Sequence, residues 1–168
     1  MTLVMDGSFL AQTGKVRPSQ IGAGAFQGIR LDGPGTGFVL EVRTDAVPVW
    51  ITEVVRRLNI AVAAAASEPG WQPITSTAII RGLQTLRSVM SADSSRPSLA
   101  PTPEGGLQFE WHDAGWDVEV EVEPDGTVET WGRHLRNGTT FDGAFANTSD
   151  SVRVALKDIT LHHSDGGG

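Results

Sequence analysis

The sequence contains no cysteine, which excludes a disulfide framework, a thiolate metal site and a cysteine nucleophile. The N-terminus also lacks a charged stretch followed by an apolar one, so we expect a cytoplasmic protein without a secretory signal. Long apolar runs are missing too: the longest, residues 60–66, is far too short to span a bilayer. We therefore expect no membrane association and, at 168 residues, a single domain with or without an appended arm.

Positive charge is missing from one stretch of the chain. Residues 101–131 carry nine carboxylates and no lysine or arginine. Because the whole chain has a net charge of −7, the remaining residues together are slightly basic. A carboxylate surface repels phosphate, so we expect no nucleic-acid binding through this stretch. It favours a basic protein partner instead.

The same stretch predicts three short strands, because apolar and polar residues alternate in it with a period of two. Leu107, Phe109 and Trp111 alternate with polar residues, and residues 115–123 continue the pattern with an acidic residue after each apolar one. Residues 112–115 and Pro124-Asp125-Gly126 are typical of turns. We therefore predict an antiparallel meander with one buried face and one acidic face.

The acidic face supplies the candidate partner-binding residues. The third strand, residues 127–131, places Trp131 on the parity of Glu129, so we expect Trp131 to be partly exposed. Trp111 and Trp116 share the apolar parity and are predicted to be buried. An exposed tryptophan is a candidate anchor for a protein interface. The predicted partner-binding residues are Glu110, Asp117, Glu119, Glu121, Glu123 and Trp131.

Two helices are predicted before the meander. The first has its cap at Thr44 or Asp45, and apolar residues recur at helical spacing to about Ala66. The second begins near Thr75 or Ser76. Its apolar stripe consists of Ile79, Leu83, Leu86 and Met90.

The rest of the chain is predicted to be mostly loop. Residues 91–103 are rich in serine and proline and indicate a linker, and residues 132–148 indicate a loop. Ser149 or Asp150 then caps a helix over residues 151–163, where β-prone residues leave a strand open as the alternative. Residues 1–44 contain eight glycines and indicate a partly β segment or arm, with its best strand at residues 38–42, and residues 164–168 indicate a flexible tail.

No motif for catalysis or for a cofactor stands out. The glycine-rich residues 22–28 lack the spacing of a dinucleotide loop. Glu110, Glu119 and Glu121 lie in an open acidic row, whereas an acid–base pair needs one carboxyl in an apolar pocket. His112, beside Glu110, points to the same open face, where nothing encloses a metal ion. We therefore expect no catalytic residue, no metal and no cofactor.

Residues 101–111, PTPEGGLQFEW, carry a resemblance to a known group. The chain resembles small uncharacterised bacterial proteins with the pattern P-x-P-[DE]-G-G-x-Q-x-E-W, followed by acidic alternating strands and a P-D-G turn. The resemblance extends over about residues 55–163 and includes the turn Pro69-Gly70-Trp71. Such proteins can lie beside toxin-like or defence genes, so the resemblance implies an antitoxin- or immunity-like role.

The sequence thus predicts an α+β domain over residues 45–163. It consists of a helix pair, an antiparallel meander of three or more strands and a C-terminal helix, with the helices on the apolar face of the sheet. The predicted function is a non-catalytic acidic module that binds a basic protein partner. Two alternatives stay open: a subunit of a larger assembly that uses residues 1–44 as a β-arm, and a hydrolase or metal-dependent enzyme without a visible motif.

Overall fold

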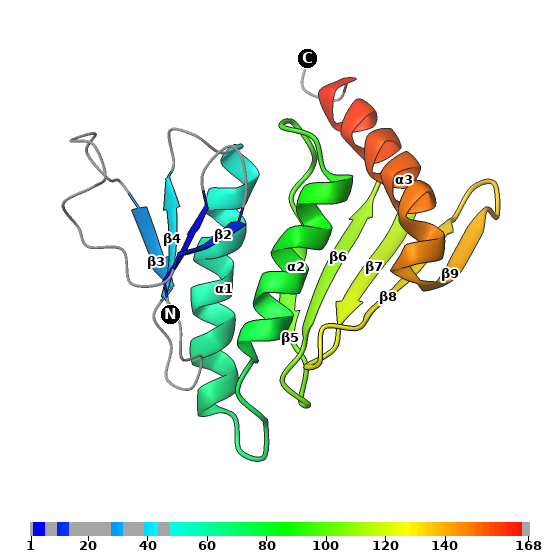
Figure 1. Ribbon diagram of the computed structural model, residues 1–168. Helices are drawn as coiled ribbons and strands as arrows, with labels where there is room; N and C mark the ends of the chain where they lie inside the picture. Colours follow the sequence, from blue (N-terminus) through cyan, green and yellow to red (C-terminus); the bar gives the residue numbers. More distant parts are fainter. Residues whose placement is uncertain (1, 6–9, 14–27, 32–38, 44–47, 166–168) are drawn as a thin grey trace.

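The computed structural model describes the backbone of residues 2–5, 10–13, 28–31, 39–43 and 48–165, and the side chains of residues 48–162. Over these residues the chain is an α+β protein with three helices and two sheets (Figure 1). The predicted fold class is therefore confirmed. None of the described helices is long and apolar enough to cross a membrane.

The helix α1 (Val49–Ser67) begins directly after Pro48, which is its N-cap residue. The predicted cap at Thr44 or Asp45 is therefore wrong. A residue that precedes proline avoids the helical region, so a helix starts readily after Pro48 and not before it. The C-terminal end lies within one residue of the predicted position.

The helix α2 (Ser76–Val89) begins as predicted. The side-chain oxygen of Thr75 accepts a hydrogen bond of 3.0 Å from the backbone N–H of Ala78, which makes Thr75 the N-cap. The same hydroxyl donates to the carbonyl of Pro124 at 2.8 Å, so the start of α2 is tied to the turn of the meander. The predicted apolar stripe is buried: Ile79, Leu83, Leu86 and Met90.

The larger sheet contains five strands in the order β5-β6-β7-β8-β9, and each neighbouring pair is antiparallel. They are β5 (Ser98–Pro101), β6 (Leu107–Asp113), β7 (Trp116–Val122), β8 (Val128–His134) and β9 (Thr140–Ala144). The three central strands are the predicted meander, although β8 continues three residues beyond Trp131.

The two edge strands correct the sequence prediction. β5 lies within residues 91–103, which were expected to be a linker, and β9 lies within residues 132–148, which were expected to be a loop. Both strands have side chains that are exposed or only partly buried, so neither carries the apolar alternation that marks a strand in the sequence. They form because β6 and β8 offer backbone N–H and C=O groups that need partners.

The helix α3 (Phe145–Asp165) is a helix, as the sequence favours, and not a strand. It starts earlier than the predicted cap at Ser149 or Asp150, because it follows β9 without an intervening loop. In its first turn the hydroxyl of Thr148 lies 2.6 Å from that of Thr130 on β8, and both residues are buried. This hydrogen bond fixes the start of α3 on the inner face of the sheet.

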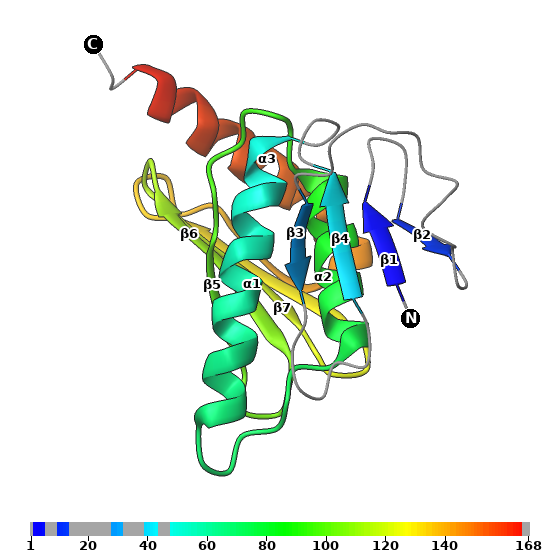
Figure 2. The ribbon, with the colours of Figure 1, turned by 90° about the vertical axis from the view of Figure 1, so that its left-hand side faces the viewer.

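The helices cover one face of the larger sheet (Figure 2). α1 contacts β5, α2 contacts β6 and β7, and α3 contacts β7, β8 and β9. The core between them contains the inward residues of β6 and β7: Leu107, Phe109, Trp111, Trp116, Val118, Val120 and Val122. No described element covers the opposite face, on which the acidic residues lie.

The described parts of residues 1–44 form a second sheet, in the order β2-β1-β4-β3. Its strands are β1 (Thr2–Met5), β2 (Leu10–Thr13), β3 (Gly28–Leu31) and β4 (Val39–Arg43), of which β1 and β4 are parallel. β3 contacts α1, and Figure 1 shows this sheet on the side of α1 away from the larger sheet. The predicted strand at residues 38–42 corresponds to β4, and residues 166–168 of the predicted tail lie outside the described part.

Candidate functional site

The open face of the larger sheet is built from rows of residues that lie opposite one another on adjacent strands. The middle row runs across all five strands and consists of Ser98, Glu110, Glu119, Trp131 and Asp142. The next row contains Gln108, Glu121, Glu129 and Ala144. Four glutamates and an aspartate therefore lie within two neighbouring rows, together with Trp131.

Two pairs on this face place like charges directly opposite each other. Glu110 on β6 lies opposite Glu119 on β7, and Glu121 on β7 lies opposite Glu129 on β8. Cross-strand pairs of like charge are destabilising, because their Cβ atoms are only about 5 Å apart. The register of the sheet thus concentrates negative charge where folding alone would favour pairs of opposite sign.

This charge is not neutralised within the described part of the chain, where no cation forms a salt bridge with Glu119, Glu121, Glu123 or Glu129. The pKa of Glu121 is raised above its ordinary value, first by partial burial and then by the charges of Glu123, Glu119 and Glu104. Burial is thus the main cause of the raised pKa, and the neighbouring carboxylates add to it.

The cations of the face lie together at one end. His112, Asp117 and Arg133 form the third row, in which His112 Nδ1 is 3.0 Å from Asp117 Oδ1 and Arg133 is 3.6 Å from Asp117 Oδ2. His112 Nε2 is also 3.6 Å from Glu110. The hydrogen bond to Asp117 is the main cause of the raised pKa of His112; burial opposes it, and the charges of Glu110 and Asp117 add to it. One end of the open face thus carries charges of both signs, whereas the charged residues at its centre are all acidic.

Trp131 stands in this centre. Its residue exposure is 39%, and its direct neighbours in the row are Glu119 and Asp142. The guanidinium carbon of Arg133 lies 5.9 Å from the centroid of its ring, which is within the range of a cation–π contact. The exposed ring therefore already contacts one guanidinium on this face.

The predicted site residues are mostly brought together by the sheet. Glu110, Glu119, Glu121 and Trp131 share the open face, and Asp117 lies on it with its carboxylate paired. Glu123 follows the end of β7, where its charge acts on Glu121. Sequence reasoning missed Asp142, because β9 was not predicted. It also missed Glu129 as a site residue, although Glu129 shares the parity of Trp131 and this parity indicates the same face.

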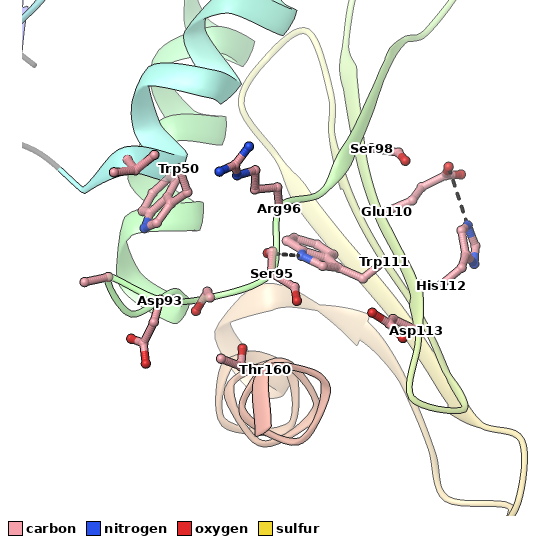
Figure 3. A pocket seen from close by; sticks show the side chains of 13 residues that line it. Trp50, Asp93, Ser95, Arg96, Ser98, Glu110, Trp111, His112, Asp113 and Thr160 are labelled. Carbon is pink, nitrogen blue, oxygen red and sulfur yellow. Dashed lines mark hydrogen bonds and ion pairs between the residues drawn. The ribbon is translucent and has the colours of Figure 1, made fainter. Parts of the chain in front are cut away.

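A cavity of about 620 Å³ adjoins the face at its edge (Figure 3). Its walls come from the start of α1, the α2–β5 connection at residues 92–96, Ser98 of β5, the end of β6 at residues 110–113 and Thr160 of α3. Trp111 Nε1 donates to the carbonyl of Ser95 at 2.9 Å, and Arg57 of α1 donates to the carbonyl of Pro97 at 2.9 Å. These two bonds hold the connection in place.

A second cavity, of about 670 Å³, lies between the β8–β9 hairpin and α3. Trp116 Nε1 donates to Asp158 at 2.9 Å, and His134 Nε2 is 3.9 Å from the same carboxylate oxygen. His134 Nδ1 accepts from the backbone N–H groups of residues 136 and 137. Both imidazole nitrogens therefore face partners, so His134 links the hairpin to α3 and does not present a free nitrogen to a substrate.

Among the residues that the structure describes, no group of three or more histidine, aspartate or glutamate side chains could hold a metal ion. Comparisons with protein families, with curated proteins and with solved structures found no match. The function is therefore inferred from the geometry and charge of the face and of the cavity at its edge.

Proposed function

We propose that this chain is a non-catalytic module that binds a basic protein partner through the open face of its larger sheet. The observation that carries the proposal is the register, which places Glu110 opposite Glu119 and Glu121 opposite Glu129. Such pairs cost stability in the free protein. The same charges attract a basic partner, and this attraction also raises the rate of association.

Trp131 serves as the anchor of this interface. Tryptophan is enriched among the residues that dominate binding free energies, and here it is partly exposed between two carboxylates. A lysine or arginine of the partner contacts the ring and pairs with Glu119 or Asp142 at the same time. The face therefore combines long-range attraction with a central apolar contact.

An antitoxin- or immunity-like role is the form of this function that we favour. An acidic neutralising protein covers the basic surface with which a toxic protein contacts nucleic acid or another anionic target. The resemblance of residues 101–111 to small uncharacterised bacterial proteins that can lie beside toxin-like or defence genes supports this role. A cytoplasmic setting, in keeping with the lack of cysteine, belongs to the same proposal.

Affinity capture from lysate tests the proposal, with the wild-type protein and two variants as baits. The variant Glu121→Gln/Glu129→Gln removes two charges from the face, and the control Glu68→Gln/Asp150→Asn removes two exposed charges elsewhere. We expect a basic partner whose affinity falls roughly tenfold in the first variant and less than twofold in the control. Mass spectrometry identifies the partner, and binding should weaken between 0.05 and about 0.5 M salt.

Two results would contradict the proposal. Equal affinity for the face variant and the control would show that the acidic face is not the contact surface. A stoichiometric set of proteins that resists high salt would favour a subunit of a larger assembly.

A further inference from the structure

The cavity at the edge of the acidic face exists because β5 is shorter than β6. The ladder between them stops at Ser98 opposite Glu110, whereas β6 continues to Asp113. Within the described residues, no backbone hydrogen bond joins the α2–β5 connection to β6 beyond that pair. The cavity is continuous with the face, since Glu110 and His112 belong to both.

The walls of the cavity are acidic. Among the described side chains, they carry the carboxylates of Asp93, Glu110 and Asp113, against the guanidinium of Arg96 and the imidazole of His112. Glu110 lies 3.6 Å from His112, and within the described part of the chain Asp93 has no salt-bridge partner. The excess of carboxylates favours a cation in this space.

One wall also holds a hydrogen-bond donor that has no acceptor among the residues that the structure describes. Trp50 lines the cavity, is only 3% exposed, and its buried indole nitrogen has no hydrogen-bond partner within the described part of the chain. In Figure 3 the indole nitrogen lies on the side of the ring that faces the connection carrying Asp93 and Ser95. A buried N–H without an acceptor is unfavourable, so a carbonyl oxygen brought here by a bound molecule would restore the missing bond.

We propose that this cavity receives an arginine side chain of the basic partner, and that a peptide carbonyl beside that arginine accepts from Trp50 Nε1. This inference rests on the proposed function and names the anchor residue of the partner. A guanidinium is planar and weakly hydrated, and it can pair with two carboxylates at once. The aromatic walls formed by Trp50 and Trp111 suit it better than a strongly hydrated ammonium group.

An anionic ligand fits the same walls less well. It could use the donors of Arg96 and Trp50, but it would also meet the three carboxylates. A peptide segment that contains arginine satisfies both sets of groups, because its side chain is a donor and its backbone carbonyls are acceptors.

The indole N–H resonances of the five tryptophans test this inference directly. The probes are N-acetyl-arginine amide, its neutral isostere N-acetyl-citrulline amide, and N-acetyl-glutamate amide. We expect the arginine probe to shift the resonances of Trp50 and Trp111, with at least fivefold weaker effects from citrulline. A shift of Trp50 by the glutamate probe alone would overturn the proposal, as would a shift of Trp131 alone by the arginine probe.

Two cavity variants and one face variant separate this inference from the proposed function. Trp50→Phe removes the donor, and Asp93→Asn removes a carboxylate from an exposed connection without touching the core. Each cavity variant should weaken the binding of the arginine probe several-fold. Glu121→Gln lies outside the cavity and should leave the binding of this probe unchanged. Asp93→Asn keeps the test valid if Trp50→Phe fails to fold.

The captured partner then distinguishes the two proposals. Loss of partner binding in both the cavity variants and the face variant supports both. Loss in the face variant alone overturns the arginine anchor and leaves the proposed function standing. Loss in the cavity variants alone supports the anchor and overturns the acidic face as the contact surface.

Discussion

His112 shows how single residues set the charge of the acidic face. It lies between Asp117 and Glu110, at 3.0 and 3.6 Å, and the hydrogen bond to Asp117 is the main reason for its raised pKa. Protonation of this one side chain reduces the negative charge at the point where the face meets the cavity. Binding of a basic partner should therefore be weaker at pH 5.5 than at pH 8.

We expect an NMR titration of His112 to give a pKa above its ordinary value of 6.5, and the Asp117→Asn variant to lower it. Because the folded-state pKa is raised, the contribution of His112 to stability is complete below the unfolded pKa and is lost as the pH rises through the folded one. The effect on unfolding is small, since the side chain is 59% exposed. An unchanged titration in the variant would contradict this assignment.

Gly132 is a second residue whose identity the packing explains. It lies opposite Phe141, and a Cβ atom on Gly132 would lie 2.2 Å from the Phe141 ring. The ring of the edge strand therefore covers the glycine of the neighbouring strand, which is a known way to stabilise a glycine in a sheet. This contact attaches β9, and with it Asp142, to the acidic face.

Gly132→Ala should displace the Phe141 ring and destabilise the protein by about 1–3 kcal/mol, as overpacking does. Urea unfolding measures the change in the free energy of unfolding. In the Phe141→Leu background the same substitution should cost less, because the smaller side chain leaves room for the methyl group. Equal costs in both backgrounds would show that the two residues are not coupled.

At the scale of elements, one strand pairing places like charges opposite each other and so opposes the stability of the sheet. The pairing of β7 with β8 places Glu121 opposite Glu129, and no described cation relieves the repulsion. The repulsion lowers the stability of the free protein, and the proposed binding of a basic partner would relieve it.

Glu129→Lys should therefore stabilise the protein by about 0.5 kcal/mol, because it converts a like-charge cross-strand pair into a pair of opposite sign. It should at the same time weaken partner binding more than tenfold. Thermal unfolding and affinity measurements on one preparation check both changes, with Glu68→Lys as the control for a general charge effect. A destabilised Glu129→Lys protein would contradict the inferred repulsion.

At the scale of the whole molecule, charge is segregated. The stretch of residues 101–131 holds nine carboxylates and no lysine or arginine, within a chain of net charge −7. The strands of the meander place five of these carboxylates on one face of the fold: Glu110, Asp117, Glu119, Glu121 and Glu129. Self-repulsion of that face opposes folding when salt is low.

Raising the NaCl concentration from 0.01 to 0.15 M should shift the urea midpoint upward, because the Debye length falls from about 30 to about 8 Å. The Glu121→Gln/Glu129→Gln variant should show a smaller salt effect than the wild type. A midpoint that does not respond to salt in either protein would show that the carboxylates do not repel one another appreciably.

Alternation and turn chemistry in the sequence were enough to predict the meander and the sides of its tryptophans. Trp111 and Trp116 are buried and Trp131 is partly exposed, as their parity predicts, because a pleated strand places successive side chains on opposite faces. Only the tertiary structure decided the rest. The edge strands β5 and β9 form because β6 and β8 offer backbone groups that would otherwise be unpaired. Trp50 and Trp111 are distant in the chain, and they line one cavity because the helices pack on the sheet.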